Sequence, residues 1–425
     1  MTMKMRYIAA ALALCIILAG CSSSNSPSAS KGSLVFGMLM PFSGPSAPDG
    51  AQVLNGCLTA EVAINSAGGI LGHQVTCQAN DTRSDPVDTV PAAQKMLATT
   101  SNLIGVLGPD SGVAPAVTPM LEKAKMVMFS VAGDPQYDHN LSPYFYRMTP
   151  SDDLAAAALA LYAKERGFKR IALVFTTDGS AQTNDPPLVH AAKYLGLQIV
   201  SNLQFPADQS SYQTEVASLI SANPQVIISE TDPQSAGTFF SELKDAGGVR
   251  PMIVTAEALY ADWQTAVKTA IGEANMQKYV TTVDPYAAST GEAWHLYAGY
   301  IRKAKGTNPA QFTTDIYART EYDGATLMAL AILMAHSTNP VTYNPYITQI
   351  AAAGTGKTIV YSYAQGKAAL AAGKKIQYIG AGGVVSLNLY HNNTGVFEIE
   401  HWVGPSGFAL EGSLPANALT QISKV

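Results

Sequence analysis

Short apolar runs alternate with longer amphipathic segments along the first part of this chain, starting at Leu34. The apolar runs are short enough for strands, and the longer segments repeat their apolar residues at helical spacing. This pattern predicts strands at 34–40, 74–79, 103–107 and 126–129, and helices at 52–66, 87–100 and 112–123. Such alternation is typical of a parallel sheet with helices on both faces.

A second alternating series follows residue 153 and then gives way to a mainly helical region. The series predicts strands at 170–175, 198–203, 225–229 and 252–255, and helices at 153–165, 186–195, 212–222 and 234–246. Further helices are predicted at 291–305, 319–337, 345–353 and 363–372, before strand-like segments at 383–389 and 396–403. Two alternating sets imply an α/β protein with two doubly wound domains.

The stretch Val106–Pro115 places a turn between a buried strand and a helix. Asp110 or Ser111 is a suitable N-cap for that helix. Unpaired N–H groups at a helix start attract anions, and open α/β folds bind ligands at the carboxyl edge of the sheet. We therefore expect a binding site here, although a capped helix without a binding role explains the same residues.

The amino terminus has the features of an export signal. Lys4 and Arg6 precede an apolar core at Ile8–Leu18, and Leu-Ala-Gly-Cys ends the segment at Cys21. This ending looks like a bacterial lipobox, which implies removal of residues 1–20 and a lipid on Cys21. The alternative is an ordinary secretory signal followed by a chance cysteine. Residues 21–33 are rich in Ser, Pro and Asn and are expected to form a flexible tether.

Composition restricts the possible partners and compartments. The 425 residues carry a net charge of −5, and removing two basic residues with the signal leaves 24 basic against 31 acidic residues, or −7. This excess of acidic residues does not favour binding to nucleic acid, which requires a basic surface. Cys15 leaves with the signal and Cys21 takes the lipid, so Cys57 and Cys77 remain. In an oxidising compartment this pair is expected to be bridged rather than free.

Several motifs carry a resemblance to a known family. Gly37–Pro45, Ile64–His73, Gly108–Gly112 and the segments 361–374 and 376–384 resemble motifs of the type I periplasmic solute-binding proteins. Within that group, the branched-chain amino-acid receptors of ABC transporters are the most similar. The resemblance implies two α/β lobes joined by three crossovers, near Tyr146–Pro150, Thr281–Pro285 and Tyr378–Val384. It assigns 34–148 and 286–378 to lobe one, 149–285 and 379–410 to lobe two, and 411–425 to a C-terminal tail.

The resemblance also implies roles for particular residues. Ser111 and Gly112 stand where the family holds the carboxylate of its ligand. The next loop, which contains Ala132, Gly133 and Asp134, stands where the family holds the ammonium group. There Ala132 supplies a carbonyl group and Asp134 replaces the usual hydroxyl residue. Glu257 aligns with an acidic residue that completes the ammonium site, although it would also suit an exposed loop.

Several positions depart from the family pattern. Asp49, Thr231 and the loop containing Asp178 lack the aromatic residues often found in these receptors. Together with Asp110 and Asp134, they make the expected cleft polar and acidic. Because a buried carboxylate needs a partner, we expect a polar or cationic amino-acid-like solute, a polyol or an amide rather than leucine. A helix cap without a binding role would also explain Asp110, and a position at the tip of a loop would also explain Asp49.

These observations predict a lipid-anchored, extracytoplasmic binding protein that delivers a small solute to the permease subunits of an ABC importer. We expect a monomer without cofactor or metal, attached to the membrane only through its lipid. The alternative is a sensor that presents the same two lobes to a signalling partner. An exported hydrolase would need a nucleophile, a base and an orienting group, and the sequence offers no such set.

Overall fold

The computed structural model describes residues 32–177 and 179–423. The predicted signal peptide, the lipidation site Cys21, most of the predicted tether, and Asp178 lie outside these residues. Within the described ranges, no helix is long and apolar enough to cross a membrane.

The first lobe is built on a parallel sheet with the strand order β2-β1-β3-β4-β5. Its strands are β1 (Leu34–Met40), β2 (Val75–Asp81), β3 (Leu103–Leu107), β4 (Met128–Ser130) and β5 (Phe145–Arg147). Most apolar residues of β1 and β3 are buried, as expected for a sheet covered on both faces. The predicted positions of the first three strands agree with the structure to within two residues.

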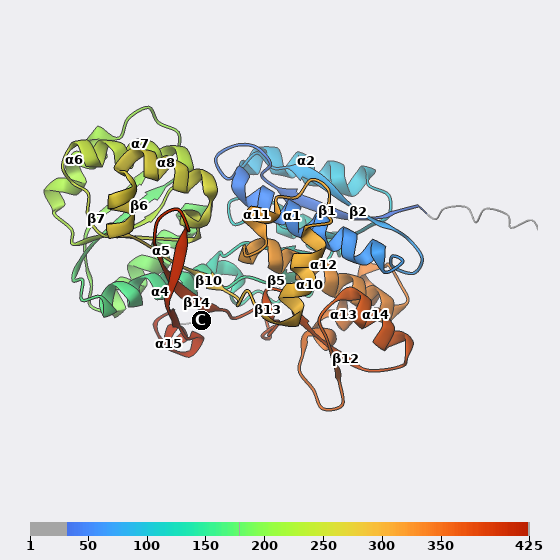
Figure 1. Cartoon of the computed structure of the whole chain (residues 1–425). Coiled ribbons are helices and arrows are strands. Elements are labelled where there is room, and N and C mark those ends of the chain that lie inside the picture. The colour runs from blue at the N-terminus through green and yellow to red at the C-terminus, as the bar shows by residue number, and fades with distance from the viewer. Residues whose placement is uncertain (1–31, 178, 424–425) are drawn as a thin grey trace, which may run out of the picture. The chain divides into compact units, whose positions relative to one another are not determined.

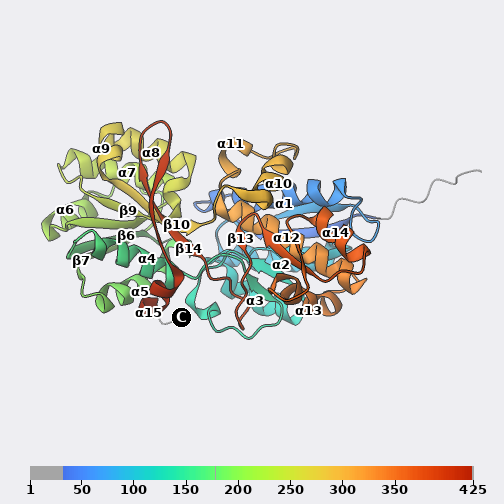
Figure 2. The same cartoon turned by 60° about the horizontal axis from the view of Figure 1, so that its bottom comes forward.

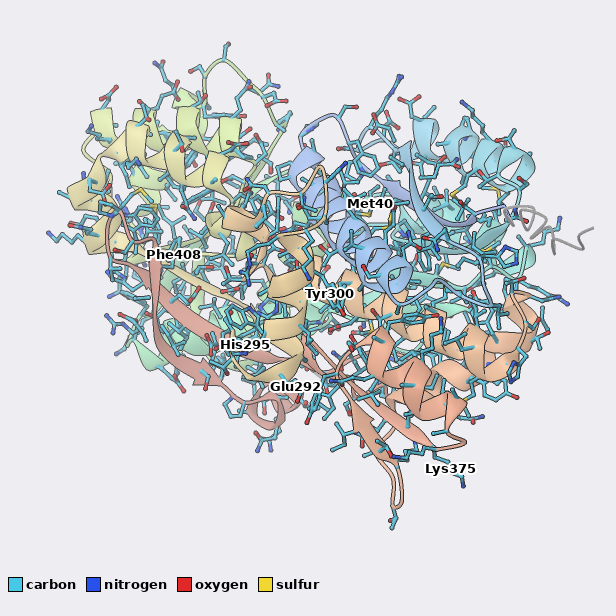
Figure 3. The ribbon with its side chains drawn as sticks, turned by 45° about the vertical axis from the view of Figure 1, so that its right-hand side comes forward. Met40, Glu292, His295, Tyr300, Lys375 and Phe408 are labelled. Carbon is cyan, nitrogen blue, oxygen red and sulfur yellow. A yellow bond between two sulfur atoms is a disulfide. The ribbon has the colours of Figure 1, made fainter. Side chains whose placement is uncertain are left out.

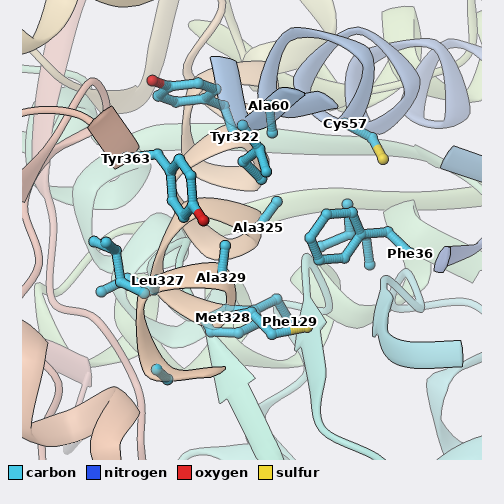
Figure 4. Packing of buried hydrophobic residues seen from close by; sticks show 14 of the residues in the cluster. Phe36, Cys57, Ala60, Phe129, Tyr322, Ala325, Leu327, Met328, Ala329 and Tyr363 are labelled. Carbon is cyan, nitrogen blue, oxygen red and sulfur yellow. The ribbon is translucent and has the colours of Figure 1, made fainter. Parts of the chain in front are cut away.

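Helices cover both faces of this sheet. One face carries α2 (Pro86–Thr99) and α3 (Ala114–Lys123). The other carries α1 (Ala47–Ser66) and α12 (Ile316–Ala335). Figure 4 shows how Ala325, Met328 and Ala329 of α12 gather with Phe36 and Phe129 of the sheet. Helix α12 is buried on nearly all sides, so a segment late in the chain completes the core of the first lobe.

The remaining elements of the first lobe are one short 3₁₀ helix after β4 and a group of elements that precede or follow α12 in the chain. They are the 3₁₀ helix η1 (Pro135–Tyr137), α10 (Gly291–Ile301), α11 (Pro309–Phe312), α13 (Pro340–Ala351), β11 (Thr358–Val360), α14 (Tyr363–Ala371), β12 (Ile376–Gly380) and β13 (Gly383–Val384). Figure 3 shows Glu292, His295 and Tyr300 along α10. Strands β11, β12 and β13 form a separate small sheet.

The second lobe contains a sheet with the strand order β15-β14-β10-β9-β8-β6-β7. Its strands are β6 (Arg170–Thr176), β7 (Gln198–Phe205), β8 (Val226–Glu230), β9 (Met252–Val254), β10 (Val280–Tyr286), β14 (Val396–Trp402) and β15 (Phe408–Leu414). The pairs β10–β14 and β14–β15 are antiparallel, and the other pairs are parallel.

Two groups of helices enclose the second sheet (Figures 1 and 2). On one face lie α4 (Asp152–Glu165), α5 (Gly179–Tyr194) and α15 (Ala416–Ser423). The other face carries α6 (Gln213–Ala222), α7 (Pro233–Asp245), η2 (Ala256–Leu259), α8 (Ala261–Ile271) and α9 (Glu273–Tyr279). Both lobes therefore have the doubly wound architecture that the alternating pattern predicted.

Two predicted boundaries in this lobe differ from the structure. Helix α5 was expected to start at Pro186 but begins at Gly179, with both Pro186 and Pro187 inside it. Burial of Ala181 and Leu188 against the sheet favours the longer helix despite the lost backbone donors. The segment 411–425, expected as a tail, contains the end of β15 and helix α15, which packs on α4.

Buried arginines hold the segments that connect the lobes. Arg147, at the end of β5, exchanges backbone hydrogen bonds with His391 (3.0 Å) and Asn393 (2.8 Å), so the first and third connections run side by side. Arg319 of α12 donates to the carbonyl groups of Ala287 (2.9 Å) and Ala381. The second connection therefore follows β10, which ends at residue 286, and the third lies between β13 and β14, at 385–395. Both lie several residues later in the chain than the expected positions at 281–285 and 378–384.

The disulfide predicted between Cys57 and Cys77 is present. It joins α1 to β2, and the Cα atoms are 6.1 Å apart. The helix and the edge strand of the first sheet are thus linked covalently.

Candidate functional site

A cavity of about 90 Å³ lies where the carboxyl ends of strands from both sheets meet the connecting segments. Loops after β3, β4 and β9 contribute residues, as do the last residue of β8 and the start of α1. The lining residues are Asp49, Gln52, Asp110, Ser111, Val131, Gly133, Thr149, Pro150, Asp152, Ala155, Asn184, Glu230, Thr255, Ala256, Glu257, Tyr260, Val283, Pro285 and Tyr317. This is the edge where open α/β sheets place their ligands.

Hydrogen bonds fix the two loops of the first lobe against each other. The hydroxyl group of Ser130 donates to the carbonyl oxygen of Pro109 (2.6 Å), and the N–H of Gly133 donates to Oγ of Ser111 (2.8 Å). Buried Arg147 donates to the carbonyl groups of Gly133 (3.0 Å) and Asp134 (3.1 Å). The short polar side chains after β3 and β4 therefore form a rigid wall rather than independent loops.

Five of the residues predicted from the sequence line this cavity: Asp49, Asp110, Ser111, Gly133 and Glu257. Gly112 and Ala132 are adjacent in the chain but do not line it. Thr231 lines a smaller neighbouring cavity with Asp49 and Glu257. Asp178 lies outside the described residues.

Asp134 differs most from its predicted position. Its side chain is buried, does not line the cavity and contacts Gln136 at 3.4 Å. Desolvation raises the pKa of Asp134 to about 6, and contacts including the Ser111 hydroxyl partly oppose this rise. Asp134 therefore lies behind the cavity wall.

The N-cap residue of α3 also differs from the prediction. The N-cap is Val113, without a capping side-chain hydrogen bond, rather than Asp110 or Ser111. The turn between β3 and α3 is longer than the pattern indicated, and it positions Asp110 and Ser111 at the cavity instead of on the first helical turn.

The structure adds residues that sequence reasoning missed, notably Asp152, Asn184, Glu230, Tyr260 and Tyr317. The two tyrosines correct the expectation that the cleft lacks aromatic walls. Glu230 is the last residue of β8, so the tendency of ligands to bind at the carboxyl ends of strands would have found it. The others come from helices and from a 3₁₀ turn, where no local signal distinguishes them from surface residues.

Burial raises the pKa of carboxyl groups around the cavity. Desolvation, with repulsion from Asp49 and Asp134, raises the pKa of Asp110 to about 8, and backbone N–H groups partly offset the rise. Desolvation likewise raises the pKa of Asp152 to about 7, opposed mainly by a hydrogen bond from Thr183. These carboxyl groups therefore take up protons near neutral pH unless a positive charge approaches them.

Five buried oxygen atoms of the lining residues have no hydrogen-bond partner in the described part of the chain: Oδ1 of Asp110, Oγ1 of Thr149, Oδ2 of Asp152, Oδ1 of Asn184 and Oγ1 of Thr255. The amide nitrogen of Asn184 donates to Oε2 of Glu230 at 2.8 Å. An unsatisfied buried polar atom costs about 1–3 kcal/mol. The cavity is therefore suited to a molecule that supplies hydrogen-bond donors.

The sequence matches the family described as periplasmic binding protein over residues 33–353. One relative is the Leu/Ile/Val-binding protein BraC3 of Rhizobium johnstonii, which is 34% identical over 144 residues. That match covers 33% of this chain and 39% of the relative, so it spans well under half of either protein. A second relative, Leu/Ile/Val-binding protein homolog 3 of Brucella melitensis, is 25% identical over 69% of this chain and 78% of its own length.

Solved structures show the same fold. A leucine-binding protein, LivK, of Thermotoga maritima superposes with a TM-score of 0.71 at 16% identity, covering 90% of this chain and 99% of its own. A solute-binding protein of an ABC transporter from R. palustris, solved in complex with benzoate, gives a TM-score of 0.70 at 16% identity and covers 90% and 96%. At this identity the likeness concerns the fold alone.

Proposed function

The chain belongs to the periplasmic binding protein family, of the branched-chain amino-acid receptor kind, and from this premise we propose that it binds a small polar amino-acid-like solute for an ABC importer. The family and fold are those of solute-binding receptors rather than enzymes. The observation that carries the proposal is the cavity lined by both lobes, with polar side chains at the carboxyl ends of their strands. Closing two lobes on a hinge is a common way to enclose a solute.

The same proposal includes delivery to a membrane permease. The family implies an extracytoplasmic location, where solute can be collected before transport. We include lipid attachment at Cys21, which rests on the lipobox-like segment of the sequence. Replacing Cys21 by Ala should abolish the incorporation of a labelled fatty acid into the protein. Equal labelling of the Cys21→Ala protein and the wild type would contradict the anchor.

Binding is tested by a thermal-shift screen of the purified protein against amino acids, amines, polyols, amides and aromatic acids. A solute that binds only the folded state raises the melting temperature by mass action. Transport is then tested by uptake of the labelled hit in cells with and without the gene. If no solute raises the melting temperature, the proposed binding function fails; if binding occurs but uptake is unchanged, the transport role fails and a sensing role replaces it.

A further inference from the structure

We propose that the solute is an uncharged molecule with three or more hydroxyl groups. This inference rests on the proposed function, because it assigns a chemical class to the solute in the same cavity. It keeps the receptor role and selects, among the polar solutes expected from the sequence, a polyol without the ammonium and carboxylate groups of an amino acid.

The first argument is the position of the hydrogen-bonding groups that the chain leaves open. Five buried oxygen atoms of the wall have no partner within the described ranges: Oδ1 of Asp110, Oγ1 of Thr149, Oδ2 of Asp152, Oδ1 of Asn184 and Oγ1 of Thr255. The first follows β3 of the first lobe, the second lies in the first connection, and the other three belong to the second lobe. A solute that satisfies these atoms therefore needs hydrogen-bonding groups spread along its length rather than gathered at one end.

The second argument is the kind of hydrogen bond that these groups make. The hydroxyl groups of Thr149 and Thr255 each donate and accept, as does a protonated carboxyl group, whereas Oδ1 of Asn184 only accepts. A hydroxyl group on the solute also donates and accepts, so it can pair with any of them. An ammonium group only donates and a carboxylate only accepts. Several hydroxyl groups therefore match the wall better than the two charged ends of an amino acid.

The protonation of the two open carboxyl groups supports the same conclusion. Desolvation raises the pKa of Asp110 to about 8 and that of Asp152 to about 7. At pH 6 both groups are therefore mainly protonated in the empty protein, and neither requires a cation from the solute.

The other three carboxyl groups of the wall interact with the chain itself. Asp49 accepts a hydrogen bond from the phenol group of Tyr260, and Glu230 accepts one from the amide group of Asn184, each at 2.8 Å. Glu257 also has an interaction of its own. These contacts lessen the need for a cationic partner on the solute.

The wall also lacks partners for an anionic solute. Among the described lining residues there is no Lys, Arg or His. At the turn before α3, the backbone N–H groups of Asp110 and Val113 interact with the carboxyl group of Asp110 itself. The hydroxyl oxygen of Ser111 accepts a hydrogen bond from Gly133 at 2.8 Å. The groups that would hold a carboxylate or a phosphate are therefore already engaged.

The remaining wall suits the carbon skeleton of a polyol. Apolar surface comes from the rings of two tyrosines and from aliphatic side chains: Tyr260, Tyr317, Val131, Val283 and Pro285. The C–H groups of a carbon chain or ring pack against such surfaces while its hydroxyl groups reach the polar atoms.

The test compares probes that share a skeleton and differ in charge. One set is sorbitol, its amine glucamine and its acid gluconate; the other is glucose, glucosamine and glucuronate. Isothermal titration calorimetry of the purified protein at pH 6 measures all six. We expect the uncharged member of at least one set to bind about tenfold or more tightly than both charged members. The proposal is overturned if a charged member binds as tightly as the uncharged one, or if neither sorbitol nor glucose binds.

Substitutions of one carboxyl group distinguish an uncharged solute from a cation. Asp152→Ala removes the hydrogen-bonding group and should weaken polyol binding about tenfold, whereas Asp152→Asn keeps a donor and an acceptor and should stay within about threefold of the wild type. Asp245→Asn, at the exposed end of α7, is the matched control and should leave binding unchanged. Loss of binding in Asp152→Asn as large as in Asp152→Ala would show that the negative charge matters and would overturn the proposal.

A threonine pair tests the hydroxyl groups of the wall. Thr255→Val keeps the shape of the side chain and should weaken polyol binding about threefold or more, because it removes one hydrogen-bonding group. Thr265→Val, on an exposed part of α8, makes the same change away from the cavity and should have no effect. Equal binding by Thr255→Val and the wild type would count against the polyol.

Amino acids measured in the same way separate this inference from the proposed function. If an amino acid binds and the polyols do not, the receptor function stands and the polyol assignment falls. If neither class binds, both the receptor function and the polyol assignment fail.

Discussion

The phenol group of Tyr260 in the second lobe donates a 2.8 Å hydrogen bond to Oδ1 of Asp49 in the first lobe. The two residues are 211 positions apart in the sequence, and both line the cavity. The bond joins the two lobes directly at the place proposed for the solute, so it favours the arrangement in which both lobes face the cavity.

Replacing Tyr260 by Phe should shift the empty protein toward more open arrangements of its lobes. A hydrogen bond to a charged group contributes about 1.5–3 kcal/mol. Its loss should therefore change the ratio of closed to open arrangements of the lobes by about tenfold or more. Small-angle X-ray scattering should show a larger radius of gyration for Tyr260→Phe. Tyr194→Phe, on an exposed part of α5, is the control. Scattering curves of Tyr260→Phe that coincide with the wild type would mean that this bond does not control the lobes.

Asp110 should make the empty protein less stable as the pH rises. The folded state keeps this proton up to about pH 8, whereas the unfolded chain loses it near the ordinary pKa of 3.8. The folded state binds more protons between these values, so the free energy of unfolding falls with rising pH. Asp49 and Asp134 add to the effect by repelling the ionised form of Asp110.

The variant Asp110→Asn should therefore unfold at higher urea concentration than the wild type at pH 8, with a smaller difference at pH 5. A pKa shift from 3.8 to about 8 corresponds to a change in the free energy of unfolding on the order of several kcal/mol at most. Urea unfolding at the two pH values measures it, and Asp245→Asn is the matched control. Equal pH dependence of Asp110→Asn and the wild type would show that Asp110 is not the group responsible.

Elements with a short-range sequence pattern were predicted correctly, whereas residues that only tertiary packing brings to the cavity were missed. Strand 103–107 was predicted with its observed bounds, because a buried apolar run has a local signature. The expectation that ligands bind at the carboxyl ends of strands also placed Asp110 and Ser111 at the cavity, and the family resemblance placed Glu257 there. Tyr317 was missed because it comes from the start of a helix more than 200 residues after Asp110, and only tertiary packing brings that helix to the cavity.

Replacing Gly133 by Ala should disturb the cavity wall. A Cβ atom at this position would lie 1.7 Å from Oδ1 of Asp152, which is too close for both to remain. Asp152 is buried, so its carboxyl group has little room to move. We expect destabilisation of about 1–3 kcal/mol, typical of overpacking, and weaker binding of any solute found in the screen.

The matched control for this change is Gly299→Ala in α10, where a Cβ atom would meet nothing within 4 Å. Alanine favours helix there, so Gly299→Ala should be neutral or slightly stabilising. Thermal unfolding of both variants makes the comparison. If Gly133→Ala is as stable as Gly299→Ala and binds solute normally, the close packing of Gly133 and Asp152 has no role in the site.

Reduction of the Cys57–Cys77 disulfide should lower stability without abolishing the fold. The bridge closes a segment with a sequence separation of 20, and the chain-entropy relation gives about 3 kcal/mol for a loop of this size. Both lobes have large buried cores, so the reduced protein should still fold. Urea unfolding with and without a phosphine reductant should show a lower midpoint in the reductant.

The double variant Cys57→Ser/Cys77→Ser provides the control, because its midpoint should not respond to the reductant. Cys57 lies in α1, the helix that also supplies Asp49 and Gln52 to the cavity. Loosening the link between α1 and β2 should therefore also weaken solute binding, by a smaller factor than removal of a cavity carboxylate. An unchanged midpoint of the wild type, with free thiols detected by titration, would show that the bridge adds no stability.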